Sequence, residues 1–106
     1  MTNKPWSLYE NYKVVDLYFE MKIKELKKDK FVKKEMIIET NSYLDRSYKS
    51  IEFKLQNITA VLEFLKQESL ILQGYAPLKN FQASLIDHVK DFLSSKRGKF
   101  IKAING

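Results

Sequence analysis

One side of a predicted helix carries side chains that can address a nucleic acid. The outward positions are Lys49, Phe53, Gln56 and Ala60, with Asn57 and Phe64 on the flank. Lysine, glutamine and asparagine donate hydrogen bonds to phosphates and to base edges. An outward Phe53 has three alternative roles: stacking on a base, contacting a thymine methyl group, or packing against another helix together with Phe64. The pattern therefore predicts either a DNA-contacting face or a second helix-packing face.

A second candidate is a run of lysines between residues 22 and 34. It contains Lys22, Lys24, Lys27, Lys28, Lys30, Lys33 and Lys34, against Glu25 and Asp29. Its net charge of +5 is most of the +6 of the whole chain. Such a corner can contact phosphates, or it can be a solvated helix end in which lysines complement the helix dipole. In the first case we expect contacts from Lys27, Lys28, Lys33 and Lys34. Base readout has less support, because Arg46 and Arg97 are the only arginines.

The same composition excludes most catalytic chemistry. The chain has no cysteine and a single histidine, His88, so it lacks a thiolate nucleophile and a His-paired zinc site. Asp45 with Glu52-Phe53-Lys54 superficially matches a metal-dependent nuclease pattern, but that chemistry needs its carboxylates on adjacent strands, whereas here they fall in helical sequence. Glu35/Glu39 and Asp87/Asp91 are carboxylate pairs one helical turn apart, which is typical of a solvated surface. We expect no catalytic residues, no metal and no cofactor.

The elements that position these residues are all predicted to be helical. Ser7 and Glu10 form a capping-box pattern ahead of a helix over residues 8–28. Its apolar stripe is Leu8, Tyr12, Val15, Phe19, Ile23 and Leu26. A second helix is predicted over 32–42, with Phe31, Val32, Met36, Ile37, Tyr43 and Leu44 inward. The turn at 45–47 supplies Asp45 or Ser47 as the cap of the next helix.

That next helix has the clearest pattern. Its inward residues, at alternating spacings of four and three, are Ile51, Leu55, Ile58, Leu62 and Leu65. Residues 73–77 form the strongest turn signal, and Asn80 can cap a fourth helix that runs to about residue 93. Lys96-Arg97-Gly98 interrupts it before a short amphipathic end at 99–104. The expected fold is an all-α bundle of four to five helices with a helix-turn-helix-like segment. We expect one domain over 1–106, with a core at about 6–93 and a helical tail at 96–104.

The N-terminus has no apolar run typical of a secretory signal, and no stretch is apolar enough to cross a membrane. We therefore expect a cytoplasmic protein without membrane contact.

Two linked motifs resemble a known helical module. Residues 46–62 read RSYKSIEFKLQNITAVL, similar to R-S-x-x-S-I-E-x-K-x-x-N-I-x-A-V-L, and residues 74–82 read GYAPLKNFQ, similar to G-Y-x-P-x-x-N-x-Q. Trp6, Glu10 and Tyr18-Phe19 fit a W-x-x-x-E…Y-F opening. Together these segments resemble the N-terminal module found ahead of HNH endonuclease or NO VEIN-type domains in bacterial restriction and defence proteins. A looser likeness to Myb/SANT domains exists at the level of the fold.

The resemblance implies a DNA-recognition or targeting role, with the catalytic residues in a domain that follows or in a partner protein. It places Arg46, Ser47, Lys49, Lys54 and Asn57 at the DNA. It also implies that Tyr75 and Pro77 fix the approach of the fourth helix. Two other hypotheses stay open: a dimerisation or protein-docking module that uses Tyr48, Phe53 and Phe64 as one apolar patch, and an enzyme in its own right.

Overall fold

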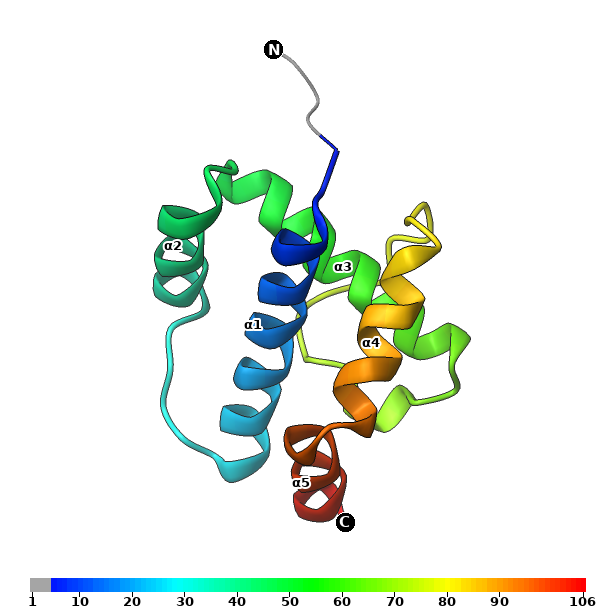
Figure 1. Ribbon diagram of the computed structural model, residues 1–106. Helices are drawn as coiled ribbons and strands as arrows, with labels where there is room; N and C mark the ends of the chain where they lie inside the picture. The colour runs from blue at the N-terminus through cyan, green and yellow to red at the C-terminus, as the bar shows by residue number, and fades with distance from the viewer. Residues whose placement is uncertain (1–4) are drawn as a thin grey trace.

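Helix α1 (Leu8–Lys27) forms the centre of the structure, a computed structural model that describes residues 5–106 (Figure 1). It contacts every other α-helix of this part of the chain. The Ser7 hydroxyl accepts from the Glu10 amide at 3.1 Å, and the Glu10 carboxylate accepts from the Ser7 amide at 3.0 Å. The predicted capping box is therefore confirmed. Lys28 ends the helix in the left-handed conformation, one residue from the predicted end.

The buried face of α1 is broader than the predicted stripe. Val15 and Phe19 are buried as expected, but Leu8 and Tyr12 are 71% and 57% exposed. Because α1 is surrounded on several sides, its core positions also include Val14, Leu17, Tyr18 and Met21. A single stripe at helical spacing describes a helix that packs on one side only. The predicted stripe is correct for Val15 and Phe19, and for Ile23 and Leu26, which pack against the core, and wrong for Leu8 and Tyr12.

Helix α2 (Lys33–Leu44) runs beside α1 and leads into α3 (Tyr48–Phe64) through the three residues 45–47. It begins one residue later and ends two residues later than predicted. Ile37 and Leu44 are buried as expected, whereas Val32 and Tyr43 are exposed. Ser47 caps α3 by accepting from the Ser50 amide at 3.1 Å. The short turn gives the predicted helix-turn-helix-like connection.

The apolar side of α3 agrees with its pattern. Ile51, Leu55, Ile58 and Leu62 are fully buried, and Leu65 is half-buried at the end of the helix. Below this side, the Tyr18 hydroxyl lies 2.8 Å from the Thr59 hydroxyl and accepts from the Leu72 amide at 2.8 Å. Burial raises the pKa of Tyr18 to about 12, so the phenol stays protonated. This buried contact joins α1 and α3 to the segment after them.

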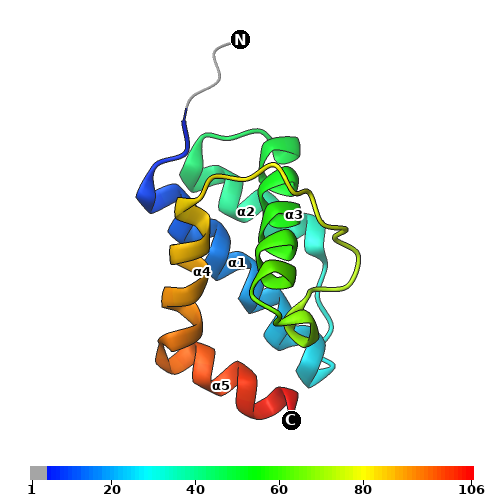
Figure 2. The ribbon, with the colours of Figure 1, turned by 90° about the vertical axis from the view of Figure 1, so that its right-hand side faces the viewer.

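A long non-helical segment crosses the outer side of α3, as Figure 2 shows. After the short 3-10 helix η1 (Glu68–Leu70), residues 71–83 form no further regular helix. The Leu78 amide donates to the Gln56 carbonyl at 3.1 Å. The Asn57 side chain donates to the Leu78 carbonyl at 2.6 Å. The predicted turn at 73–77 is confirmed, but the segment continues, so the fourth helix does not start at Asn80.

Helices α4 (Ser84–Ser94) and α5 (Lys96–Asn105) complete the bundle. A break between the fourth helix and a helical tail is present as predicted, but it falls at Ser95, and Lys96-Arg97-Gly98 belong to the first turn of α5. Ser95 caps α5 by accepting from the Gly98 amide at 3.2 Å, and Gly98 itself is buried. A Cβ at this position would lie 2.2 Å from the Phe92 carbonyl oxygen, so the glycine permits a close approach of the two helices. Helices make up the regular secondary structure of residues 5–106, which confirms the predicted all-α fold.

Candidate nucleic-acid interface

Arg46 is part of an internal ion pair that holds the start of α1 to the start of α3. Its guanidinium donates to both Glu10 carboxylate oxygens, at 2.8 and 2.7 Å, and to the Pro5 carbonyl at 2.7 Å. The guanidinium also lies 4.6 Å from the centre of the Trp6 ring. Only 8% of the Arg46 side chain is exposed. The resemblance places this residue at the DNA, whereas in the structure its guanidinium donates hydrogen bonds to Glu10 and Pro5.

Lys54 belongs to the same cluster. Its residue is 6% exposed, and its amine lies 4.8 Å from the centre of the Trp6 ring. Burial, followed by the nearby Arg46 charge, lowers the pKa of Lys54. The hydrogen bonds from Arg46 hold the pKa of Glu10 at about 2, so this carboxylate stays charged. The cluster of Trp6, Glu10, Arg46 and Lys54 therefore holds residues 5–7, the N-terminal segment, against the start of α3. Lys54 is buried in this cluster, so its amine does not face a ligand.

Two further residues of the predicted DNA face have structural roles. The Ser47 hydroxyl is occupied as the cap of α3. Asn57 is 6% exposed, and its side-chain amide donates hydrogen bonds to the carbonyls of Leu78 and Asn80. Ala60, predicted to point outward, is 4% exposed. The segment 71–83 thus covers the middle of the outer side of α3, and the first turns and the last turn of the helix remain open.

The open first turns of α3 bring together Lys49, Phe53 and Gln56. They line a cleft of about 250 Å³ with Glu52, Gly74 and Tyr75, which we call the Phe53 cleft. Phe53 is 47% exposed, and the Lys49 amine lies 5.8 Å from its ring centre. The Phe53 cleft therefore combines the aromatic ring of Phe53 and the amine of Lys49 with the amide of Gln56 and the carboxylate of Glu52.

The predicted lysine corner divides into internal and exposed residues. Lys22 is buried and donates to the Glu25 carboxylate at 2.7 Å and to the Ile71 carbonyl at 3.1 Å. Lys33 donates to the Gln73 carbonyl and lies 5.0 Å from the centre of the Tyr75 ring. Lys27, Lys28, Lys30 and Lys34 are exposed. Lys27 has a carboxylate oxygen of Asp29 at 3.9 Å, which is a weak pair between exposed groups.

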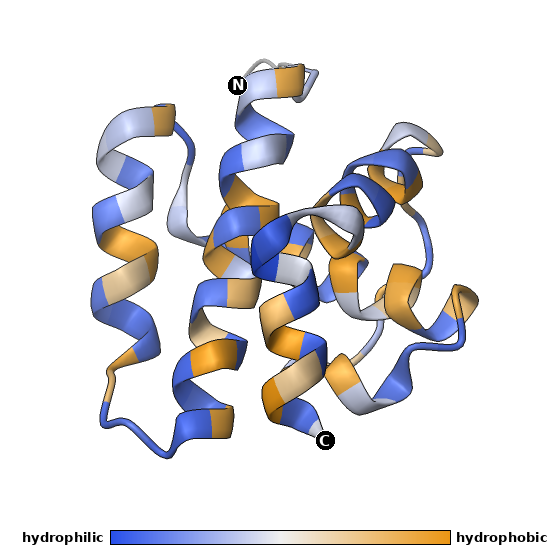
Figure 3. Ribbon diagram, turned by 60° about the horizontal axis from the view of Figure 1, so that its bottom comes forward, coloured by the Kyte–Doolittle hydropathy of each residue, from blue (hydrophilic) through white to orange (hydrophobic). Residues whose placement is uncertain are grey.

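Helix α5, predicted only as a helical tail, contributes further lysines to the positive charge of the surface. Residues 96–102 carry three lysines and an arginine with no carboxylate, a net charge of +4. Lys99 and Lys102 are exposed. Figures 1 and 2 both place the C-terminal half of α5 at the same end of the molecule as the α1–α2 loop. We call the exposed lysines of this end, together with Lys34 in the first turn of α2 where the loop stops, the basic end: Lys27, Lys28, Lys30, Lys34, Lys99 and Lys102. Figure 3 brings this end forward and shows most of the α1–α2 loop as hydrophilic.

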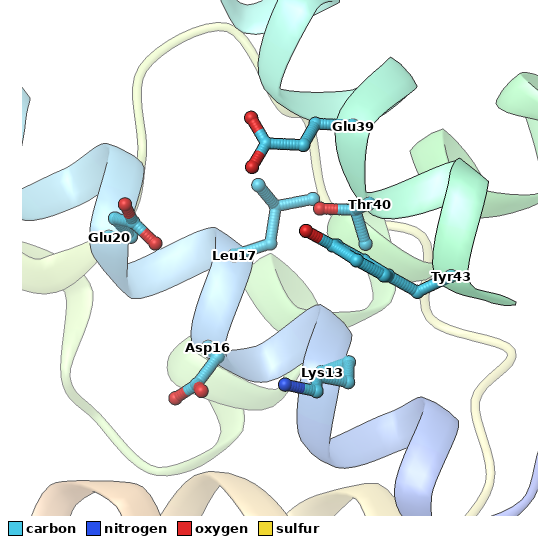
Figure 4. Close-up of a pocket in the computed structure, with 7 residues that line it drawn as sticks. All are labelled: Lys13, Asp16, Leu17, Glu20, Glu39, Thr40 and Tyr43. Atoms are coloured by element: carbon cyan, nitrogen blue, oxygen red, sulfur yellow. The ribbon is translucent and has the colours of Figure 1, made fainter.

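The opposite electrostatic character is found between α1 and α2. A pocket of about 210 Å³ is lined there by Asp16, Glu20 and Glu39 together with Lys13, Thr40 and Tyr43 (Figure 4). Asp16 accepts from Arg97 at 3.0 Å. Within residues 5–106, no group of three or more histidine, cysteine, aspartate or glutamate side chains is arranged to hold a metal ion. This pocket would repel phosphates, which leaves the basic end and the Phe53 cleft as the candidate interface.

None of the helices that the structure describes has the length and apolarity needed to cross a membrane. Comparisons with family models, curated proteins and solved structures found no match for this chain.

Proposed function

We propose that this chain is a DNA-binding module that targets a nuclease of a bacterial restriction or defence system. The observation that carries the proposal is the basic end, where exposed lysines from two segments far apart in the sequence lie at one end of the molecule. The basic end carries six exposed lysines, and the loop adds one exposed carboxylate, Asp29. Lys33 and Arg97 of the same segments donate to partners within the fold instead. Clustered lysines of this kind bind phosphates and release condensed counterions.

In this proposal the module contacts the DNA backbone and leaves most base reading to other parts of the system. Arg46 and Asn57, the side chains best suited to bidentate base contacts, are occupied inside the fold. The module is not an enzyme. Catalysis belongs to a nuclease domain or a partner protein, as the motifs at 46–62 and 74–82 imply, and the system acts in the cytoplasm.

Neutralising part of the basic end tests the proposal. We expect the triple variant Lys28→Gln, Lys30→Gln, Lys34→Gln to bind a fluorescent DNA duplex about 10- to 100-fold more weakly than the unmodified chain at about 0.1 M salt, because phosphate contacts are lost. The matched control is the triple variant Lys66→Gln, Lys79→Gln, Lys90→Gln, which removes the same charge from exposed lysines elsewhere. Equal weakening by both variants would show a general charge effect and contradict a localised interface.

A second candidate function, protein docking, is favoured by a different observation. Phe64 is 65% exposed and lines a cleft of about 330 Å³ with Ala60, Glu63, Lys79 and Phe81. Phe53 lies in another cleft and Tyr48 is half-buried, so the three aromatic residues do not form the single apolar patch predicted. Loss of a nuclease partner on Phe64→Ser, with DNA binding unchanged, would support this second role.

A further inference from the structure

The Phe53 cleft contains the chemistry that recognises an unpaired nucleobase. Phe53 presents nearly half of its surface to solvent, at 47% exposure, although it lies in the middle of an ordered helix. Any of the four bases can stack on such a ring, since every base has a π face. Lys49 lies over the same ring and supplies a positive charge beside it. In a bound nucleotide, Phe53 would therefore stack on the base and Lys49 would contact the phosphate.

The walls of the cleft provide hydrogen-bonding groups for the base edge. Glu52 and Gln56 line it together with Phe53, one turn apart on α3. A carboxylate accepts from an exocyclic amino group such as N4 of cytosine, which thymine lacks. An apolar cleft for a protein side chain would not need this carboxylate and amide. The lining therefore favours an amino-bearing base.

The cleft has a second cation behind one of its walls, and it lies in the N-terminal half of α3, at the other end of the molecule from the α1–α2 loop and α5 (Figures 1 and 2). Tyr75 lines the cleft, and the Lys33 amine lies 5.0 Å from the centre of the Tyr75 ring. Lys33 begins α2 and is followed directly by Lys34 of the basic end. Lys49, with Lys33 behind Tyr75, would therefore supply the positive charge for the phosphate of a nucleotide in the cleft.

We propose that the Phe53 cleft binds one unstacked, amino-bearing base of a single-stranded DNA segment. This inference rests on the proposed function, which it deepens by naming unpaired rather than fully paired DNA as the preferred ligand. The stacking partner is Phe53, and Glu52 accepts from the amino group of the base.

The test uses fluorescent single-stranded oligocytidine and oligothymidine deoxynucleotides of equal length, and a duplex. We expect Phe53→Leu to weaken single-strand binding about five- to 100-fold, the range for loss of one stacked base, and to leave duplex binding unchanged. Phe53→Tyr keeps the aromatic face and should bind like the unmodified chain. We expect the unmodified chain to prefer oligocytidine over oligothymidine, and Glu52→Gln to remove this preference. Circular dichroism melting of each variant controls for folding.

The outcomes separate the inference from the proposed function. If Phe53→Leu binds the single strands as tightly as the unmodified chain, while the lysine triple variant still loses duplex binding, base stacking is overturned and DNA binding stands. Equal weakening of single-strand and duplex binding by Phe53→Leu also overturns it, because a duplex offers no unstacked base. If the unmodified chain binds neither ligand, both proposals fail.

Discussion

Glu10 shows how one carboxylate can serve a helix end and a distant arginine together. Its oxygens accept from the Ser7 amide and from the Arg46 guanidinium, and its side chain is only 13% exposed. Charge-assisted, two-pronged pairs of this kind are stronger than neutral hydrogen bonds. The pair explains why Arg46 is fixed in place and why the pKa of Glu10 falls to about 2. It makes the folded state sensitive to acid at this residue.

We predict that this pair gives the protein an acid-dependent stability that Glu10→Gln removes. The pKa of Glu10 is about 2 in the folded state, while an unperturbed glutamate titrates near 4.3. The stabilisation is therefore complete above about pH 5 and is lost as the pH falls toward 2. Between pH 7 and pH 3 the unmodified chain should lose about 1–2 kcal/mol more than Glu10→Gln in the free energy of unfolding.

Urea unfolding at the two pH values measures this difference. Glu39→Gln, at an exposed position of α2, is the matched control and should follow the unmodified chain. Parallel pH dependences for the unmodified chain and Glu10→Gln would contradict the assigned role of the pair.

The same residues mark the limit of prediction at this scale. The motif resemblance places Arg46, Lys54 and Asn57 at the DNA, and the structure buries all three side chains among partners. Their partners are far away in the chain: Glu10 and Trp6 precede them, and Leu78 follows. A helical wheel gives only the angles between neighbouring residues of one helix. It cannot show that residues 5–7 and the segment 71–83 cover a polar side of α3. Lys49 and Phe53 remain exposed, because the segment 71–83 only lines a cleft beside them, through Gly74 and Tyr75, and does not cover them.

At the scale of elements, periodic sequence is informative and aperiodic sequence is not. The spacing of Ile51, Leu55, Ile58 and Leu62 predicts α3 and its buried side correctly, and Ser7 and Ser47 predict two helix starts. The segment 71–83 has no repeat, so its path over α3 follows only from hydrogen bonds made in three dimensions. Gly98 was assigned to the break before the tail, whereas it lies inside α5, where close packing against the end of α4 requires a glycine.

Gly98→Ala should therefore destabilise the junction of α4 and α5. The added Cβ would lie 2.2 Å from the Phe92 carbonyl oxygen and 2.6 Å from the Leu93 backbone, neither of which is the end of a flexible side chain. We expect a loss of about 1–3 kcal/mol in the free energy of unfolding, as for other overpacked sites. Lys99→Ala, at the next and exposed position, should change it by less than about 0.5 kcal/mol. Equal urea midpoints for the two variants would refute this account of Gly98.

At the scale of the whole molecule, charge is distributed unevenly over the bundle. Lysines of the basic end come from α1, α2, α5 and the α1–α2 loop, and the acidic pocket lies between α1 and α2. Composition reveals the net charge of +6, but only the fold shows that α5 and the α1–α2 loop share one end. The DNA would thus approach from that end.

The salt dependence of duplex binding should report how many lysines take part. Each phosphate contact contributes a slope of about −0.9 to the logarithm of the binding constant against the logarithm of the salt concentration. The Lys28, Lys30, Lys34 triple variant should therefore show a slope shallower by about 2 to 3 than the unmodified chain. Titrations at several salt concentrations measure both slopes. An unchanged slope would place the phosphate contacts elsewhere on the surface.

The cluster around Trp6 has an optical consequence. Trp6 is the only tryptophan of the chain, and its ring lies beside both the Arg46 guanidinium and the Lys54 amine. The intrinsic fluorescence of the protein therefore reports on this one junction between the N-terminal segment and α3. Emission from an unlabelled sample would follow the release of that segment, while circular dichroism would follow the helices. The two signals together would reveal whether the segment leaves α3 before the bundle unfolds.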